Sequence, residues 1–361
     1  MRLFQNAGIY PAYLRRLNRV AAKAETHSAR KNAFLSDRFG APHFLKPVLD
    51  HDASAFFTNG DDAKLQRLWA RENGLAAKMS LEDILLAQIE AHRTEVFYNI
   101  DPTRYSPRFL KRLPGSVRRK IAWRAAPSPA TDLGAYDLVV CNFTGILANY
   151  RRLGWKSAWF APAHDPVMDT FASNCDRPID VLFVGSYTRH HLRRAELLEA
   201  VASLSERYTI AMHLDRSGLT RLAEALPSGL ALLSGHRRPA VIRAVSRPPV
   251  FGIDMYGALS QAKIVLNGAV DMAGDDRGNM RCFESMGCGC ALLSDAGNYP
   301  QGMETDVTMA SYTNPDDAVA RVDALLIDPL RTRAMAAAGY RMISEQYSKQ
   351  RQWHCFVELA Q

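Results

Sequence analysis

The sequence predicts an α/β protein made of two domains, each built around a parallel β-sheet. Apolar runs of strand length alternate with stretches of helix length along most of the chain, and connections of that length favour parallel pairing. With 361 residues, the chain is longer than one hydrophobic core usually organises. A segment rich in proline and polar residues, 162–178, interrupts the alternation as a linker would. We therefore expect Rossmann-like domains at residues 1–165 and 166–348, followed by a final helix at 349–361.

The first domain is predicted to begin with a strand and to alternate clearly from residue 95 onward. Its expected strands cover the first residues of the chain and residues 54–58, 95–100, 120–124, 136–141 and 156–161. Its expected helices cover residues 13–25, much of 30–94 and the segment that ends at Arg152. Proline or glycine follows several of these strands and helices, as is typical of their ends.

The second domain repeats the alternation of strands and helices. Its expected strands cover residues 180–184, 208–213, 230–234, 264–267, 291–294 and 307–312. Its expected helices cover residues 189–206, 219–225, 254–263, 279–287, 315–327 and 329–347, and a last helix covers 349–359. The run at 291–294 is almost wholly apolar, which is typical of a parallel strand covered on both faces.

The stretch 274–295 carries the most chemical information. It predicts a glycine-rich loop, a short helix and a buried strand, and the N–H groups at the start of such a helix favour an anion. Arg281 would add a pair of donors for phosphate, and Glu284 could accept hydrogen bonds from the two hydroxyls of a ribose. The stretch therefore suits a nucleotide diphosphate, although the same i,i+3 pair also suits an ordinary surface ion pair. Helical spacing places Met280, Phe283 and Gly287 on one face and the charged pair on another.

These residues resemble the C-terminal domain of GT-B glycosyltransferases, and in particular the CgeB-like (spore-maturation-type) branch of the group 1 families. The matching positions are Gly278, Asn279, Met280, Arg281, Phe283, Glu284, Cys288 and Gly289. Relatives with an E-x7-E motif would place its second residue at Glu284 and its first at Asp276, which is an aspartate here. The resemblance implies two Rossmann-like domains that face each other across a cleft, with the final helix crossing back onto the N-terminal domain.

The resemblance and the strand ends together give a set of candidate donor-binding residues. They are Gly185, Ser186, Arg189, Asn267, Asn279, Arg281 and Glu284. Glycine at the end of the strand at 180–184 would let the backbone approach a phosphate, and Arg189 could reach that phosphate. Alternatively, Arg189 belongs to a solvated helix start, and Asn267 merely ends a strand.

Candidate catalytic residues are Asp101, which follows a strand of the first domain, and His164 at the domain junction. Relatives place a polar catalytic or acceptor-binding residue near the first position. Histidine is the side chain most easily tuned for proton transfer near neutral pH. A structural role is the alternative for both residues.

No cofactor and no metal ion is expected. Cys288 and Cys290 lack a second pair of ligands at zinc spacing, so the six cysteines are expected to be free and mostly buried. Leaving-group charge would then be stabilised by cationic side chains and helix N-termini.

The charge balance is basic, with a formal net charge of +8. Eight cations are concentrated in one part of the first domain, with Asp101 as the only acid nearby: Arg104, Arg108, Lys111, Arg112, Arg118, Arg119, Lys120 and Arg124. No nucleic-acid-binding motif accompanies this run, so we expect an anionic acceptor, an anionic membrane surface or a merely solvated face. The chain has no apolar segment of membrane-spanning length and no signal-peptide core. We expect a cytoplasmic protein, which this run would allow to contact the inner face of a membrane peripherally.

The functional prediction is a metal-independent, retaining glycosyltransferase. It would move a sugar from a nucleotide-diphosphate-sugar donor to a glycan, lipid-linked or protein acceptor. Two alternatives remain open, namely a nucleotide-sugar epimerase of GT-B-like fold and a non-catalytic partner that binds a nucleotide sugar or a glycan. Donor turnover without an acceptor would favour the epimerase, and binding without turnover would favour the partner.

Overall fold

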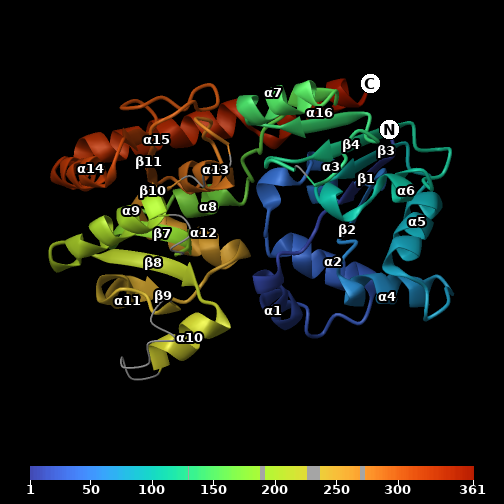
Figure 1. The fold of residues 1–361 in the computed structure, drawn as a ribbon, viewed down its shortest axis with the longest axis horizontal. Coiled ribbons are helices and arrows are strands. Elements are labelled where there is room, and N and C mark those ends of the chain that lie inside the picture. The colour runs from blue at the N-terminus through green and yellow to red at the C-terminus, as the bar shows by residue number, and fades with distance from the viewer. Residues whose placement is uncertain (129, 188–191, 226–235, 269–272) are drawn as a thin grey trace. The chain divides into compact units, whose positions relative to one another are not determined.

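The chain folds into two compact units (Figure 1). The structure is a computed structural model that describes residues 1–361 apart from 129, 188–191, 226–235 and 269–272. Unit 1 comprises Met1–Ala163, Met272–Asp276 and Tyr347–Gln361, and unit 2 comprises His164–Asp271 and Arg277–Gln346. The units differ from the predicted domains mainly in one respect: the short segment before Arg277 belongs to unit 1.

Unit 1 contains a six-stranded sheet in the order β2-β1-β3-β4-β5-β6. Its strands are β1 (Leu3–Asn6), β2 (Ala55–Thr58), β3 (Val96–Asn99), β4 (Arg119–Trp123), β5 (Leu138–Cys141) and β6 (Ser157–Trp159). Every pairing is parallel, with Leu3 opposite both Ala55 and Val96. The carboxyl ends of β1, β2 and β3 therefore lie side by side.

Helices connect these strands, and most of them begin at a polar capping residue. They are α1 (Pro11–Val20), α2 (His27–Ser36), α3 (Lys46–Leu49), α4 (Ala63–Glu72), α5 (Leu81–Ala91), α6 (Pro107–Leu110) and α7 (Thr144–Arg152), with 3-10 turns at Ala41–His43 and Pro102–Arg104. Thr26, Asp62, Ser80 and Ser106 each accept a hydrogen bond from a first-turn N–H group. Such caps satisfy donors that the helix itself leaves open.

The last helix, α16 (Lys349–Ala360), is held in unit 1 by buried polar contacts. The Nζ of Lys349 donates hydrogen bonds to the carbonyl oxygens of Ala41, Pro42 and Phe44 at 2.7, 3.0 and 2.7 Å. Gln352 donates to the carbonyl oxygens of Pro42 and Ala161. A buried ammonium group is tolerated only when such acceptors replace water, so these contacts fix the position of α16.

Unit 2 contains a second six-stranded parallel sheet, in the order β12-β11-β10-β7-β8-β9. Its strands are β7 (Ile179–Ser186), β8 (Ile210–Asp215), β9 (Ser246–Arg247), β10 (Ala262–Asn267), β11 (Ala291–Asp295) and β12 (Ala310–Tyr312). Its helices are α8 (Met168–Ala172), α9 (Leu192–Ala202), α10 (Gly218–Ala225), α11 (Ala240–Val245), α12 (Gly252–Ser260), α13 (Met280–Gly287), α14 (Pro315–Ile327) and α15 (Pro329–Gln346), with a 3-10 turn at Ser203–Glu206. The apolar run of β11 is fully buried, as the sequence predicts.

Most predicted elements are confirmed to within a few residues, and three differences among the described residues stand out. The helix predicted over 13–25 ends at Val20, because Thr26 caps the next helix. Gly185 and Ser186, which follow the strand predicted at 180–184, continue β7 because they pair with Leu214 and Asp215 of β8. The short strand β9 is not predicted, since two residues carry no periodic pattern. The strand predicted at 230–234 lies outside the described residues.

No helix among the described residues combines the length and the hydrophobicity that crossing a bilayer requires.

Candidate functional site

Several predicted residues meet at the carboxyl edge of the unit 2 sheet. Strands β7, β10 and β11 are parallel neighbours, so their last residues, Ser186, Asn267 and Asp295, lie at one edge. Helix α13 begins after β10, at Met280. In sheets of this kind, ligands bind outside the carboxyl ends of the strands. This edge is therefore the candidate site of unit 2.

Asn267 is the centre of a hydrogen-bond network at this edge. Its Nδ2 donates to Ser294 Oγ at 2.9 Å, and its Oδ1 accepts from Asn279 Nδ2 at 3.2 Å. The hydroxyl of Tyr312 donates to the Asn267 carbonyl oxygen at 2.8 Å. Asn267 is only 5% exposed. Its hydrogen bonds connect β10 with β11, β12 and the residue before α13. The side chains of Asn267 and Asn279 therefore hydrogen-bond to each other and to neighbouring residues, and so help to position this edge.

The start of α13 has the geometry of an anion site. Gly278 adopts a φ of 97°, which favours glycine, and Asn279 is extended and leads directly into the helix. The side chain of Asn279 does not cap the helix. The N–H groups of Met280 and Arg281 have no acceptor within the helix, so this end offers donors to a ligand.

Arg281 and Glu284 form an ion pair, but it is not a surface pair. Arg281 Nη1 lies 2.7 Å from Glu284 Oε2, and the exposed fractions of the two side chains are 18% and 0%. Burial raises the pKa of the Glu284 carboxyl, and the charge of Arg281 opposes that rise. Glu284 Oε1 accepts no hydrogen bond from any described residue. Glu284 therefore holds the inner side of Arg281, while the guanidinium remains partly exposed.

Helix α13 is more deeply buried than an amphipathic surface helix. All residues from Cys282 to Gly287 are buried, so of the charged pair only Arg281 is partly exposed. Helices α8 and α15 and strands β10 and β11 all pack against it, and Arg281 contacts Met255 of α12. Charge at i,i+3 spacing indicates a shared face, but it does not reveal what covers that face.

Asp276 has a structural partner in unit 1. Its Oδ1 accepts a hydrogen bond from Thr144 Oγ1 at 2.9 Å, and its Oδ2 accepts one from the N–H of Gly145. Both donors lie in the first turn of α7, whose own preceding residue, Phe143, supplies no side-chain cap. A carboxylate at this position satisfies open N–H groups and the helix dipole. The first position of the E-x7-E pattern thus serves as a distant helix cap.

Gly185 and Ser186 lie at the end of β7, and Gly185 is exposed. A Cβ atom on Gly185 would lie 2.9 Å from the Phe183 ring, so packing alone accounts for a glycine there. Arg189, the third residue predicted in this region, lies outside the described residues.

Two arginines that the prediction did not select also lie at this edge. Arg277 forms an ion pair with Asp295, and its N–H donates to the Asn298 carbonyl oxygen. Arg194 of α9 donates to the carbonyl oxygen of Gly268, directly after β10. A signal for Arg277 was available in the sequence, because it stands in the glycine-rich loop immediately before Gly278.

Asp101 belongs to a polar cluster at the carboxyl edge of the unit 1 sheet. Its Oδ2 accepts a hydrogen bond from Arg104 Nε at 2.7 Å, and Arg104 Nη2 also lies 3.2 Å from Asp61 Oδ2. Asp61 accepts hydrogen bonds from the N–H of Ile9, and its burial raises the pKa of its carboxyl. A Cβ atom on Gly8 would lie 2.7 Å from Asp101, so the carboxylate sits directly against the loop after β1. Asp61 was not predicted, because it lies in a segment expected to be mostly helical.

His164 is packed inside unit 2. It is 4% exposed, and its Nε2 lies 2.7 Å from Asp169 Oδ1, which also accepts a hydrogen bond from the Tyr340 hydroxyl. A Cβ atom on Gly287 of α13 would lie 3.0 Å from His164 Nδ1. The surroundings of His164 are those of a packing residue, and the residue belongs to a different unit from Asp101.

The cysteines are free, as predicted, and four of the six are buried. Burial raises the pKa of the Cys290 thiol to about 11 and that of Cys282 to about 12. Within the described parts of the chain, no three His, Cys, Asp or Glu side chains are grouped so that they could hold a metal ion.

Comparison with known proteins agrees with this architecture. Residues 193–358 match a protein family described as glycosyl transferase-like. No curated protein sequence matches the chain significantly. Among solved structures, Anabaena HepE in complex with UDP and glucose aligns with a TM-score of 0.59 and 11% identity over 99% of both chains.

Two further solved structures share the arrangement. A glycosyltransferase from Rickettsia africae aligns with a TM-score of 0.56 and 10% identity, over 99% of this chain and 97% of the other. Sucrose-phosphate synthase from Thermosynechococcus elongatus aligns with a TM-score of 0.53 and 12% identity, over 99% and 98%. At such identities the likeness establishes the fold alone, and that fold is GT-B. Residues 193–358 thus match a glycosyl transferase-like family within a chain of GT-B fold.

Proposed function

We propose that the protein is a glycosyltransferase that moves a sugar from a nucleotide-diphosphate-sugar donor to a glycan, lipid-linked or protein acceptor. The proposal rests on the position of the candidate site within the matched region, and the fold shared with HepE supports it. The glycosyl transferase-like region, residues 193–358, contains the network around Asn267, the start of α13 and the Arg281–Glu284 pair. HepE, which has the same fold, has been solved with UDP-glucose, and this supports a uridine nucleotide as the first donor to test.

The diphosphate would bind at the start of α13. There it would accept hydrogen bonds from the backbone N–H groups and from the exposed side of Arg281. Negative charge grows on the diphosphate as the glycosidic bond breaks, so donors fixed in advance favour the transition state. Glu284 is wholly buried in this structure. We therefore assign Glu284 the task of orienting Arg281, in place of the ribose contact that the resemblance implies.

Metal independence and retention at the anomeric carbon are parts of the proposal that rest on different grounds. Metal independence rests on the supply of cations at this edge, where Arg281 and Arg277 could take the place of a divalent ion. Retention rests on the resemblance to the E-x7-E families and on the CgeB-like pattern around Arg281.

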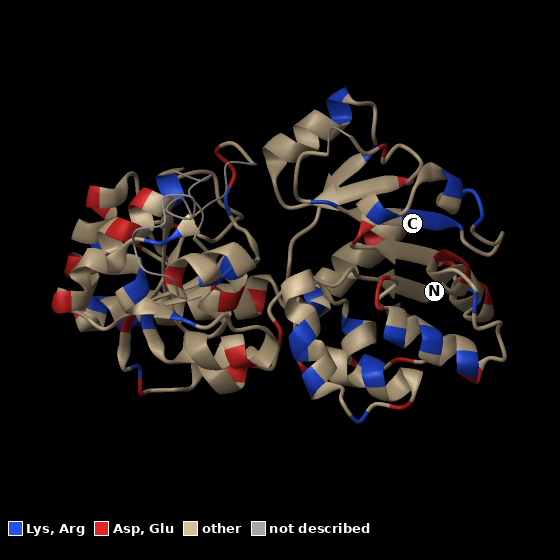
Figure 2. Ribbon diagram, turned by 60° about the horizontal axis from the view of Figure 1, so that its bottom comes forward, with Lys and Arg blue, Asp and Glu red and all other residues tan. Residues whose placement is uncertain are grey.

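The basic run of unit 1 is partly neutralised. Arg104, Arg112 and Lys120 form ion pairs with nearby carboxylates. Arg119 donates to the Leu359 carbonyl oxygen, and Arg124 donates to Ser128 Oγ. Arg108, Lys111 and Arg118 form no ion pair with a described residue. Figure 2 shows that lysine and arginine also occur on other elements of unit 1. We propose that these three cations, rather than all eight, face an anionic acceptor or membrane.

A thermal-shift panel of UDP-, GDP-, dTDP-, ADP- and CMP-sugars tests the donor. A donor present at a hundred times its dissociation constant adds about 2.7 kcal/mol of stability, which is easily seen. Mass spectrometry of candidate acceptors then tests transfer. Donor isomerisation without any acceptor would establish an epimerase instead, and stabilisation without transfer or hydrolysis would establish a non-catalytic binding protein.

A further inference from the structure

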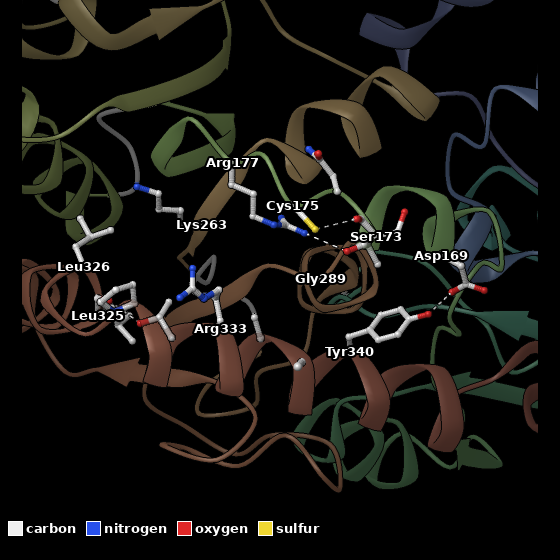
Figure 3. A pocket seen from close by; sticks show the side chains of 16 residues that line it. Asp169, Ser173, Cys175, Arg177, Lys263, Gly289, Leu325, Leu326, Arg333 and Tyr340 are labelled. Carbon is white, nitrogen blue, oxygen red and sulfur yellow. Dashed lines mark hydrogen bonds between the residues drawn. The ribbon is translucent and has the colours of Figure 1, made fainter.

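Unit 2 contains a cavity of about 640 Å³ that is separate from the candidate donor edge (Figure 3). It lies between the segment 169–177, the helices α14 and α15, and the amino-terminal ends of two strands. Lys263 is the second residue of β10, and Gly289 precedes β11, whereas the candidate donor site lies where these strands end. The cavity is therefore at the opposite edge of the sheet, and none of the residues proposed to bind the donor lines it.

One side of the cavity is apolar. Leu325 and Leu326 of α14 line it, and α15 contributes Ala336 and Ala337. The volume and the apolar lining are typical of sites for small molecules rather than of gaps between side chains.

Three cations reach the same space. Arg177 is held by the carbonyl oxygens of Ala262 and Cys288, at 2.9 and 3.0 Å, so its position is fixed by the fold. Lys263 is 49% exposed and forms an ion pair with Asp180. Arg333 rises from α15 into the space that Figure 3 shows below Arg177 and Lys263, and it makes no hydrogen bond or ion pair with any described residue.

The single carboxylate in the lining is already engaged. Asp169 accepts hydrogen bonds from the Tyr340 hydroxyl and contacts His164 Nε2, at the far end of the cavity from Leu325. Three cations and one carboxylate line the cavity, so the charge of its lining is positive on balance, and this charge lies beside the apolar side.

We propose that this cavity binds a small amphipathic anion, with its apolar body against α14 and α15 and its anionic head at Arg333 and Lys263. The head could be a carboxylate or a phosphate, since both accept hydrogen bonds from arginine and lysine. This second site is independent of the proposed donor chemistry, and its test does not require a sugar nucleotide.

The first test uses two fluorescent probes of nearly the same shape. 8-Anilinonaphthalene-1-sulfonate has an apolar body with an anionic head, and N-phenyl-1-naphthylamine has the same body without the charge. We expect the sulfonate to bind with a defined stoichiometry of one and the neutral probe to bind far more weakly. Equal binding of the two probes would overturn the proposal, because it would show that the cations contribute nothing.

Variants of α15 locate the binding. Arg333→Gln should weaken sulfonate binding about fivefold, as expected for one partly exposed charge contact, and Ala337→Trp should abolish it by filling the cavity. Arg341→Gln is the matched control, since Arg341 is exposed on the same helix but does not line the cavity. An equal loss with Arg341→Gln would place the probe elsewhere and contradict the proposal.

A cysteine in the cavity gives a readout that does not depend on fluorescence. Cys175 lines the cavity and is exposed, four cysteines are buried, and the remaining one, Cys355, can be changed to serine. In that variant the sulfonate should slow the alkylation of Cys175 by N-ethylmaleimide, followed by intact mass. Unchanged alkylation at saturating sulfonate would overturn the assignment of the site.

Competition identifies the head group. Displacement of the sulfonate by octanoate would indicate a carboxylate head, and displacement by octyl phosphate a phosphate head. If octanol displaced it equally well, or if none of the three did, an amphipathic anion would not be the ligand of this cavity.

Discussion

The carboxyl edges of the two sheets share a buried asparagine contact but differ in how their charged residues are paired. In unit 1, Asn6 at the end of β1 donates to Asn99 Oδ1 at 2.9 Å, and in unit 2 Asn267 at the end of β10 donates to Ser294 Oγ at the same distance. In each case a buried asparagine joins the ends of neighbouring strands.

Beyond this shared contact, the two edges pair their charged residues differently. In unit 1 the two carboxylates of Asp61 and Asp101 share one cation, Arg104, whereas in unit 2 Arg281 and Arg277 each pair with one carboxylate, Glu284 and Asp295. An edge with cations and free N–H groups suits a diphosphate, and an edge with carboxylates suits a hydroxyl group that must lose a proton. Under the proposed function, the same architecture would serve these two tasks through the residues that follow its strands.

The largest effect is expected from Arg281→Ala, which removes the exposed cation of the unit 2 edge. Loss of a charge-assisted hydrogen bond should weaken donor binding by about 1.5–3 kcal/mol. The variant also leaves Glu284 buried without a partner, so it should be less stable in the absence of donor. The affinity is measured by titration calorimetry with the best nucleotide sugar from the thermal-shift panel. Arg193→Ala, an exposed arginine at the start of α9, is the control, and equal affinities for all forms would remove Arg281 from the site.

The variant Asp276→Ala distinguishes an effect on the stability of unit 1 from an effect on donor binding. Because Asp276 caps α7 of unit 1, its loss should cost about 0.5–2 kcal/mol of stability and leave donor affinity unchanged. Denaturant unfolding and a donor titration measure the two quantities, and Asp275→Ala, an exposed neighbour, is the control. A loss of affinity at unchanged stability would instead support the E-x7-E role for this residue.

A smaller effect per residue is expected from changing Arg108, Lys111 and Arg118 to serine. Each cation near an anionic lipid surface contributes about 1 kcal/mol, and this attraction is screened over roughly 10 Å at 0.1 M salt. Co-sedimentation with liposomes containing anionic lipid, across a salt series, is the measurement. Serine at Arg15, Arg19 and Lys23, exposed cations at and beyond α1, removes the same charge elsewhere. If both triple variants lose binding equally, general charge and not this surface attracts the membrane.

Glu284→Gln should change the pH dependence of stability. Burial raises the pKa of Glu284 in the folded state, so its favourable contribution is complete below the ordinary pKa of a glutamic acid. That contribution is lost as the pH rises through the raised value. Glutamine does not titrate, so the stability of the variant relative to the parent should increase as the pH rises from the ordinary pKa of a glutamic acid through the raised value of Glu284 in the folded state. Thermal melts across this range test the sign, and a parent that gains on the variant as the pH rises would contradict it.

No effect is expected from chelation. If Arg281 and Arg277 stabilise the leaving diphosphate, EDTA should leave the transfer rate unchanged. The nearby Asp275 and Asp276 are the obvious metal ligands should this be wrong. Loss of transfer in EDTA that is restored by manganese or magnesium would show that a metal supplies the charge.

Sequence reasoning succeeded where the pattern is local. Strands such as β10 and β11 are continuous apolar runs, and α14 begins at Asn314–Pro315, where asparagine caps and proline fits the first turn. The pairing of Arg281 with Glu284 also follows from local spacing. These features depend on residues within a few positions of one another.

Features that depend on distant partners were not accessible. The acceptor of the Thr144 hydrogen bond is Asp276, and the partners of Lys349 begin at Ala41. The burial of Glu284 depends on elements that pack around α13 from several parts of unit 2, so its full desolvation could not be read from the helical pattern. Periodicity predicts which residues share a face, while the cover of that face comes from the tertiary fold.

The hydrogen bonds of Lys349 have a consequence for the order in which the protein folds during synthesis. Unit 1 needs residues from both ends of the chain, whereas all the residues of unit 2 lie between His164 and Gln346. A ribosome therefore completes unit 2 before it adds Lys349, whose ammonium group donates to the carbonyl oxygens of Ala41, Pro42 and Phe44. Until then the first 163 residues lack α16, and the apolar surfaces that it covers, including the ring of Tyr98 beside Phe356, remain open to other chains. Unit 1 is thus begun before unit 2 and completed after it.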